Sequence, residues 1–207
     1  MTIENLLKAV PPPAEPFEAY LGTWELIEGD LGTRLPQDYK DFVQLYGSGY
    51  FLEFMGVYVP RSRNPNLRLE TNVSSICRLL RTLEDLPHPV WPAEDGMIPF
   101  GGTDNGDYLL WIARGAPDDW PVAIWEVRGG KFEVIECDLT DFFAGLASGA
   151  IASEILPSDL ALCERPFQPH SAWPNAPSDL VRDLSGTGKP DFGPLRTRLR
   201  FPIRPPF

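Results

Sequence analysis

The sequence has few of the residues on which most enzyme mechanisms depend. It contains only two histidines and three cysteines, Cys77, Cys137 and Cys163, which lie far apart along the chain. An odd number at this spacing matches neither a zinc site nor a disulfide framework, and indicates a reducing compartment. Neither His88, which lies between two prolines, nor His170 belongs to a recognisable Ser-His-Asp or Cys-His arrangement.

Motifs for nucleotide binding, zinc-dependent proteolysis and serine hydrolysis are also lacking. No GxSxG, HExxH or GxxxxGK[ST] occurs, and SGTGK at 185–189 has the wrong spacing for a phosphate-binding loop. No apolar run approaches the roughly 18 residues of a membrane span, and the opening MTIENLLKAVPPPAE contains no signal-peptide core. The sequence therefore predicts a cytoplasmic protein without catalytic residues, cofactor or membrane segment.

Acidic side chains are abundant, and their distribution is uneven. The 29 Asp and Glu outnumber the 18 Lys and Arg, which gives a net charge of −11. Residues 1–163 hold 11 basic against 25 acidic side chains, giving −14, whereas residues 164–207 hold 7 against 4, giving +3. Because an acidic body repels phosphates and attracts cations, we expect a basic protein partner and no direct binding of nucleic acid.

The length and the proline distribution predict one domain with extensions. A chain of 207 residues suits a single core, and most of its 23 prolines lie towards the two ends. We predict an N-terminal segment and linker at 1–16, one domain at 17–156 and a proline-rich, basic C-terminal extension at 157–207. The ending RTRLRFPIRPPF alternates arginine with apolar residues, which is typical of a strand. We expect this strand to form salt bridges with the acidic body, with nucleic-acid binding as the less economical alternative.

Helical periodicity and end signals predict five helices. Pro36 suits a first helical position, Asp38 and Asp41 suit the positive end of the same helix, and Gly47 suits its stop. Asp138 is a natural N-cap for the segment LTDFFAGLASG. The expected helices are 2–10, from 17 to 29 or 32, 36–47, 70–86 and 139–149.

Runs of β-branched and aromatic residues predict the strands. The run YFLEFMGVYV predicts one strand at 50–59. Four further strands are expected at 97–100, 107–114, 122–127 and 132–137, joined by turns at 101–106, 115–120 and the Gly129-Gly130 hairpin. Because these connections are short, the four strands must form an antiparallel meander.

Two acidic loops are the candidate sites. In IPFGGTDNGDYLLW at 98–111, Asp104, Asn105 and Asp107 could supply oxygen ligands to Mg²⁺ or Ca²⁺, or Asn105-Gly106 could form a turn next to the strand that Asp107 begins. The twelve-residue calcium-loop pattern is absent, which favours the turn and predicts no metal. The second loop is GAPDDWP, where solvated carboxylates stand beside Trp120, a residue suited to capping a core or anchoring a partner.

The middle of the chain resembles a known superfamily. The run LGTRLPQDYKDFVQLYGSGYF at 31–51 is similar to the LP-x-x-[YF]-x-x-F opening of SUKH domains, which occur in Smi/Knr cell-wall-assembly regulators and many bacterial immunity proteins. The segment IPFGGTDNGDYLLW resembles their I-P-x-G turn, and WPVAIWEV and FEVIECDLTDFFAGL resemble their later strands and closing helix. The resemblance extends over about residues 21–156.

The resemblance implies a fold class and a function. It implies an α+β domain with helices packed on a mainly antiparallel sheet, and no catalytic residues. It also implies an immunity protein that binds and neutralises a cognate polymorphic toxin, often a nuclease, or alternatively a regulatory or scaffolding module of the Smi/Knr type without a toxin partner. The toxin-contact candidates are Asp95, Asp104, Asp107, Asp118, Asp119 and Trp120.

A hypothesis from a different class is a metal-dependent hydrolase. Its carboxylates would come from the same two loops, namely Asp104, Asp107, Asp118 and Asp119. This hypothesis requires those four side chains to converge on one ion.

Overall fold

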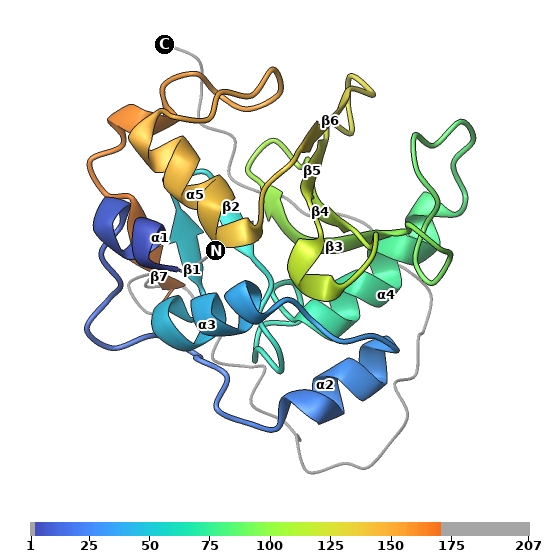
Figure 1. The fold of residues 1–207 in the computed structure, drawn as a ribbon, viewed down its shortest axis with the longest axis horizontal. Coiled ribbons are helices and arrows are strands. Elements are labelled where there is room, and N and C mark those ends of the chain that lie inside the picture. Colours follow the sequence, from blue (N-terminus) through green and yellow to red (C-terminus); the bar gives the residue numbers. More distant parts are fainter. Residues whose placement is uncertain (1–2, 171–207) are drawn as a thin grey trace. The chain divides into compact units, whose positions relative to one another are not determined.

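The computed structural model describes residues 3–170, which form an α+β fold (Figure 1). Within these residues a seven-stranded sheet has the order β6-β5-β4-β3-β2-β1-β7, and every pair of neighbouring strands is antiparallel. Helices pack against this sheet, so the predicted fold class is confirmed. The strands are β1 Gly49–Phe51, β2 Met55–Val57, β3 Met97–Thr103, β4 Tyr108–Ile112, β5 Val122–Trp125, β6 Phe132–Ile135 and β7 Phe167–Pro169.

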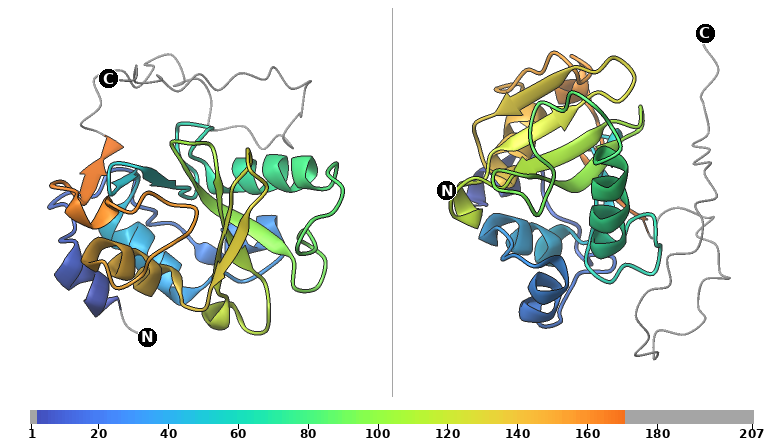
Figure 2. Two further views of the ribbon diagram at one scale, coloured as in Figure 1. Left: turned by 90° about the horizontal axis from the view of Figure 1, so that it is seen from above. Right: turned by 90° about the vertical axis from the view of Figure 1, so that its right-hand side faces the viewer.

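The helices of the described residues surround the sheet in two groups. α4 packs against β3, whereas α3 lies beside α5, and α1 packs on α5 (Figures 1 and 2). None of these helices is long and apolar enough to cross a membrane. The α-helices are α1 Glu4–Ala9, α2 Trp24–Leu31, α3 Gln37–Tyr46, α4 Leu69–Leu80 and α5 Leu139–Ser148, and the 3₁₀ turns are η1 Pro117–Asp119 and η2 Leu160–Leu162.

The predicted stop of α3 and the predicted N-cap of α5 are confirmed. α3 starts one residue later than predicted, with Pro36 as its N-cap and not as its first helical residue, and it stops at Gly47, which has a positive φ of 66°. A Cβ on Gly47 would lie 2.3 Å from the carbonyl oxygen of Phe17, so glycine is required here for both conformation and space. Asp138 caps α5, because its side chain accepts a hydrogen bond from the backbone N–H of Asp141.

The prediction of a single strand at 50–59 is wrong. The chain turns back after β1, at Leu52 and Glu53, which have positive φ values of 50° and 51°, and returns as β2. Residues other than glycine, asparagine and aspartate rarely adopt this backbone conformation, so Leu52 and Glu53 carry no turn signal in the sequence.

The second predicted helix starts later than its apolar periodicity suggests. Phe17 forms a bridge with Gly47 instead of a helical turn, and its carbonyl oxygen accepts a hydrogen bond of 2.6 Å from the N–H of Ser48. The helix begins only after Thr23. Tertiary pairing of the segment therefore overrides its local pattern. The helix predicted at 70–86 likewise ends earlier, at Leu80.

The predicted turn at 101–106 is shorter than expected, and the predicted turn at Gly129-Gly130 is longer. Gly101 and Gly102 belong to β3, and a Cβ on Gly101 would lie 2.5 Å from the carbonyl oxygen of Gly56 on β2. The turn itself occupies residues 104–106, where Gly106 has a φ of 87°. The loop between β5 and β6 is longer than Gly129-Gly130, because the hydrogen bond that closes it runs from the N–H of Glu126 to the carbonyl oxygen of Lys131. The predicted meander of β3, β4, β5 and β6 is confirmed.

Buried aromatic rings bring α3 and α5 together over the sheet. The ring of Phe143 on α5 lies 5.6 Å from that of Phe42 on α3 and 4.3 Å from that of Phe51 on β1. Tyr39 is fully buried, stands edge-on to Trp111 at 5.1 Å, and donates a hydrogen bond of 2.7 Å to the carbonyl of Tyr58. This packing fixes the start of α3 next to the start of α5.

The described part of the predicted C-terminal extension contains η2 and β7. β7 pairs with β1 at the edge of the sheet, a strand that the sequence pattern does not predict. The remainder of that extension, including SGTGK and the arginine-bearing ending with its predicted strand, lies outside the described residues.

Candidate interaction surface

A depression of about 440 Å³ gathers carboxylates from four parts of the chain. Its walls come from α1, the start of α3, η1 and the N-cap of α5. No Lys or Arg is among its lining residues. We call this site the acidic depression, and it is lined by Ile3, Glu4, Gln37, Asp38, Asp41, Asp118 and Asp138.

Two helix N-termini explain why carboxylates gather in the acidic depression. Asp118 Oδ1 accepts a hydrogen bond of 2.7 Å from the N–H of Gln37 at the start of α3. Asp38 Oδ2 accepts one of 3.0 Å from the N–H of Thr140 in the first turn of α5, which Asp138 also caps. Free N–H groups and the helix dipole make such positions favourable for anions. Part of the negative charge is therefore balanced within the fold.

Asp38 carries an electrostatic penalty at this site. The pKa of Asp38 is raised to about 6, because burial and, to a smaller extent, the neighbouring charge of Asp138 raise it more than the hydrogen bonds from the backbone N–H groups of Thr140, Tyr39 and Leu139 lower it. The ionised carboxylate is therefore less stable here than in water. A positive charge brought into the acidic depression by a partner would relieve this penalty.

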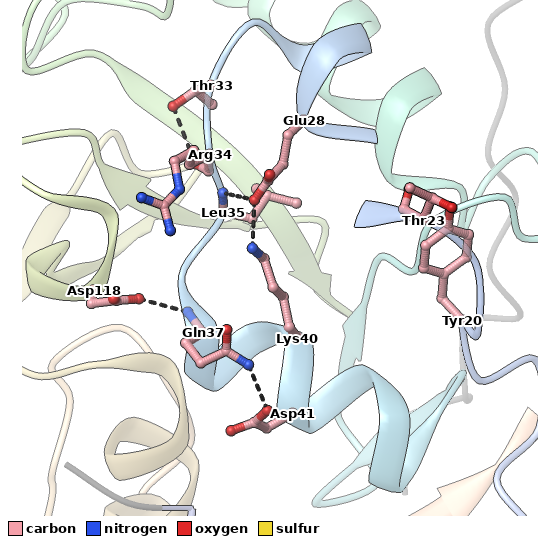
Figure 3. A network of polar contacts seen from close by, with 10 residues as sticks. All are labelled: Tyr20, Thr23, Glu28, Thr33, Arg34, Leu35, Gln37, Lys40, Asp41 and Asp118. Atoms are coloured by element: carbon pink, nitrogen blue, oxygen red, sulfur yellow. Dashed lines mark hydrogen bonds and ion pairs between the residues drawn. The ribbon is translucent and has the colours of Figure 1, made fainter. Parts of the chain in front are cut away.

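A second depression, of about 740 Å³, is lined by residues of α2, α3 and the segments next to α2, several of which are drawn in Figure 3. Gln37 lines both depressions, so the two meet at the start of α3. We call it the mixed depression, because its lining residues carry both signs of charge: Gly22, Thr23, Trp24, Glu25, Glu28, Arg34, Gln37, Lys40 and Gln44.

The central charges of the mixed depression are paired with each other. Lys40 Nζ lies 2.5 Å from Glu28 Oε1, with side chains only 11% and 13% exposed, and 5.8 Å from the ring centroid of Trp24. Glu28 Oε1 also accepts a hydrogen bond of 2.9 Å from the N–H of Leu35 (Figure 3). Burial alone would raise the pKa of Glu28, but the hydrogen bonds from Lys40 and Leu35, together with the positive charges of Lys40 and Arg34, outweigh it and lower that pKa. This pair fastens the loop between α2 and α3.

The structure spreads the predicted acidic contact residues over separate places. Asp118 lies in the acidic depression, and Asp119, next to it on η1, is exposed. Asp104 is exposed in the β3–β4 turn and accepts a hydrogen bond from the Tyr50 hydroxyl. Asp95 is partly exposed in the loop before β3. Only Asp118 is therefore joined to a larger group of carboxylates.

Two of the predicted contact residues are buried, and both serve the fold. Asp107 is 3% exposed, accepts a hydrogen bond of 2.9 Å from the Thr103 hydroxyl, and accepts one of 3.3 Å from the N–H of Val127. Trp120 is 4% exposed and packs 6.1 Å from the ring of Trp111. Asp107 therefore braces its turn, and Trp120 caps the core.

The described residues offer no converging metal ligands. In residues 3–170 no three His, Cys, Asp or Glu side chains are grouped so that they could hold an ion. Of the carboxylates in the hydrolase hypothesis, Asp107 is engaged with Thr103, Asp104 with Tyr50, and Asp118 with Gln37. The convergence that the hypothesis requires is therefore absent from this part of the chain.

The thiols are held in their protonated form. Burial raises the pKa of Cys77 to about 11, and burial together with the charges of Asp138 and Asp141 raises that of Cys137 to about 12. Burial also raises the pKa of Cys163. A thiol is a nucleophile only as its thiolate, so these environments disfavour thiol chemistry at neutral pH.

Four carboxylates of the acidic depression are not among the residues that the sequence predicts for a site. Glu4, Asp38, Asp41 and Asp138 line it together with Asp118. Three of them stand at predicted helix starts, which was the available signal. Nothing in the local pattern shows that the starts of α3 and α5 lie side by side.

Comparison with known proteins identifies the family. The family model SUKH_6, described as SMI1-KNR4 cell-wall, matches residues 22–143, which include α2 to α4, β1 to β6 and the first half of α5. No curated protein and no solved structure gives a significant match. Because the family model covers more than half of the chain, the protein belongs to the SUKH family of SMI1-KNR4 domains.

Proposed function

We propose that this protein is an immunity protein that binds and neutralises a cognate polymorphic toxin through the acidic depression. The family assignment supports a protein-binding role of this kind. The observation that carries the proposal is the gathering of five carboxylates from four segments, without a basic side chain among the lining residues. Basic side chains on the toxin would complement this surface and associate faster because of it.

The toxin class that best fits this chemistry is a nuclease. A nuclease binds phosphates with Lys and Arg, and a rigid array of carboxylates can occupy the same basic groove. Three of the five carboxylates are preorganised, because Asp118, Asp38 and Asp138 accept hydrogen bonds of 2.7, 3.0 and 2.7 Å from backbone N–H groups. Little side-chain entropy would therefore be lost on binding.

Co-expression with the toxin encoded beside this gene tests the proposal. We expect the two proteins to co-purify as a complex and the cells to survive toxin expression only when this protein is present. Absence of both binding and protection, with the toxin shown to be active, would contradict the proposal.

A second candidate function is a regulatory or scaffolding module without a toxin partner. The cell-wall description of the matching family favours it. The neighbouring gene separates the two functions, because an immunity gene lies beside a toxin gene and a scaffolding gene has no such requirement.

A further inference from the structure

β7 is held at the edge of the sheet by a short contact with β1. Three residue pairs connect the strands, from Gly49↔Pro169 to Phe51↔Phe167. Proline has no N–H to donate, which shortens the ladder at its outer end. The ring of Phe167 packs 5.2 Å from that of Tyr46. Because this strand is so short, the residue that follows it contributes strongly to its attachment.

That residue is His170, which forms two hydrogen bonds with Ser48. The His170 N–H donates to the carbonyl oxygen of Ser48 at 3.1 Å, and the Ser48 hydroxyl lies 2.7 Å from His170 Nδ1. Ser48 is fully buried, and the imidazole stands edge-on to the ring of Tyr50 at 5.2 Å. The pair spans 122 positions of the chain and is not visible in the sequence.

The surroundings of the imidazole favour its neutral form. Burial lowers the pKa of His170 below 6.5, and the carboxylate of Glu18 offsets this only in part. Glu18 is itself bound to the hydroxyl of Ser62 at 2.7 Å and to the N–H of Arg63 at 3.2 Å. From β1, Tyr50 faces the imidazole with its ring, and the hydroxyl of Tyr50 is directed to Asp104.

We propose that His170 is a pH-sensitive latch: its neutral imidazole, seated on Ser48 and Tyr50, holds β7 on β1, and its protonation releases β7 from the sheet. Release leaves β1 as the edge of the sheet, with backbone N–H and C=O groups open to another strand. It also uncovers the face of Tyr46 that Phe167 covers. This inference does not depend on the proposed function.

The direction of the pH effect follows from proton linkage. A histidine in the released segment takes up a proton near its ordinary pKa of 6.5, whereas the docked imidazole resists it. Above that pH both states are neutral and the latch is closed. As the pH falls below it, the ratio of released to docked β7 rises by up to about tenfold per pH unit, until the docked imidazole also titrates.

Two amides report on the docking of β7 in the full-length protein. The Leu52 N–H donates to the carbonyl of Pro166 and the His170 N–H to that of Ser48, so both become exposed on release. Hydrogen exchange by NMR, corrected for intrinsic rates, is measured from pH 7.5 to 5.5. We expect protection of both amides to fall in the wild type and equally in His88→Ala, which removes the other histidine of the chain.

The variant His170→Asn keeps an acceptor near the position of Nδ1 but does not titrate. We expect the protection of the Leu52 amide to be independent of pH in this variant. An equal pH-dependent loss in His170→Asn, or pH-independent protection in the wild type, would overturn the latch.

A second measurement does not require His170 to be changed. In His88→Ala a single imidazole remains, and its NMR titration gives the pKa of His170 directly. A value below 6.5 supports the latch, and a value at or above 6.5 overturns it.

Discussion

Asp118 Oδ1 accepts a hydrogen bond of 2.7 Å from the backbone N–H of Gln37, although 81 positions separate the two residues in the chain. The contact joins η1 to the first turn of α3 and orients one carboxylate of the acidic depression. The same side chain therefore serves the fold and the proposed binding surface. Substitutions that remove only the charge can separate these two roles.

Asp118→Ala is expected to lower the free energy of unfolding by about 0.5–1 kcal/mol, because the start of α3 loses an acceptor for its N–H. Asp118→Asn keeps an acceptor oxygen and is expected to cost less. Asp119→Ala is the control, since Asp119 is exposed and adjacent. Urea denaturation measures all three, and equal effects for Asp118→Ala and Asp119→Ala would disprove the capping role.

Asp138→Asn is expected to lower the pKa of Asp38 from about 6, because the Asp138 charge is one of the causes of its rise. Asparagine is also a good N-cap, so α5 stays intact. Carboxyl chemical shifts followed by NMR between pH 3 and 8 give the pKa in both proteins. An unchanged titration of Asp38 in the variant would show that the charge of Asp138 does not contribute to its raised pKa.

The raised pKa of Asp38 also fixes the direction of its effect on stability. The folded state holds this proton up to about pH 6, whereas the unfolded chain releases it near the ordinary pKa of 3.8. The contribution of Asp38 to stability is therefore lost as the pH rises from about 4 to about 6. Denaturation of the wild type and of Asp38→Asn should differ in slope over this window, and parallel curves would contradict the assignment.

Glu28→Gln is expected to destabilise the protein by about 1–3 kcal/mol, because it leaves the largely buried Lys40 without its counter-charge while keeping an acceptor for the Leu35 N–H. In a double-mutant cycle with Lys40→Met, the loss of stability in the double variant should be smaller than the sum of the losses in the two single variants. Glu136→Gln is the control, because its pair with Arg114 has side chains 67% and 54% exposed, and such pairs contribute little. Strict additivity of the Glu28 and Lys40 variants would rule out a stabilising pair.

Gly101→Ala is expected to cost about 1–3 kcal/mol, because the added Cβ would lie 2.5 Å from the backbone oxygen of Gly56 and push β2 and β3 apart. Gly56→Ala is the matched control on the opposite strand, where an added Cβ meets nothing within 4 Å. Thermal or urea denaturation compares the two. A larger loss for Gly56→Ala would contradict the close approach at Gly101.

The elements predicted well from the sequence are those whose signals are local. α3 and α5 carry apolar stripes and clear end signals such as Gly47 and Asp138, and the meander follows from short connections. The β1–β2 hairpin could not be predicted, because Leu52 and Glu53 adopt a conformation that their residue types disfavour. β7 depends on pairing with a strand more than a hundred positions earlier, for which no local pattern exists.

The candidate site was predictable only in part, for a related reason. The sequence indicates that Asp38, Asp41 and Asp138 belong at helix starts, and it singles out Asp118. Their gathering depends on the contact between Phe42 and Phe143, which sets α3 beside α5. The burial of Asp107 also depends on tertiary contacts, because its carboxylate accepts a hydrogen bond from the N–H of Val127, which follows β5.

The affinity of this protein for the toxin that the proposed function requires, measured by calorimetry, tests the central claim most directly. The variant Asp41→Asn/Asp118→Asn removes two charges of the acidic depression, and Glu84→Gln/Asp85→Asn removes two exposed charges that do not line it. We predict that the first variant binds at least about tenfold more weakly than the wild type and that the second binds within about twofold of it. Equal affinities for the two variants, with the wild type binding tightly, would contradict the acidic depression as the contact surface.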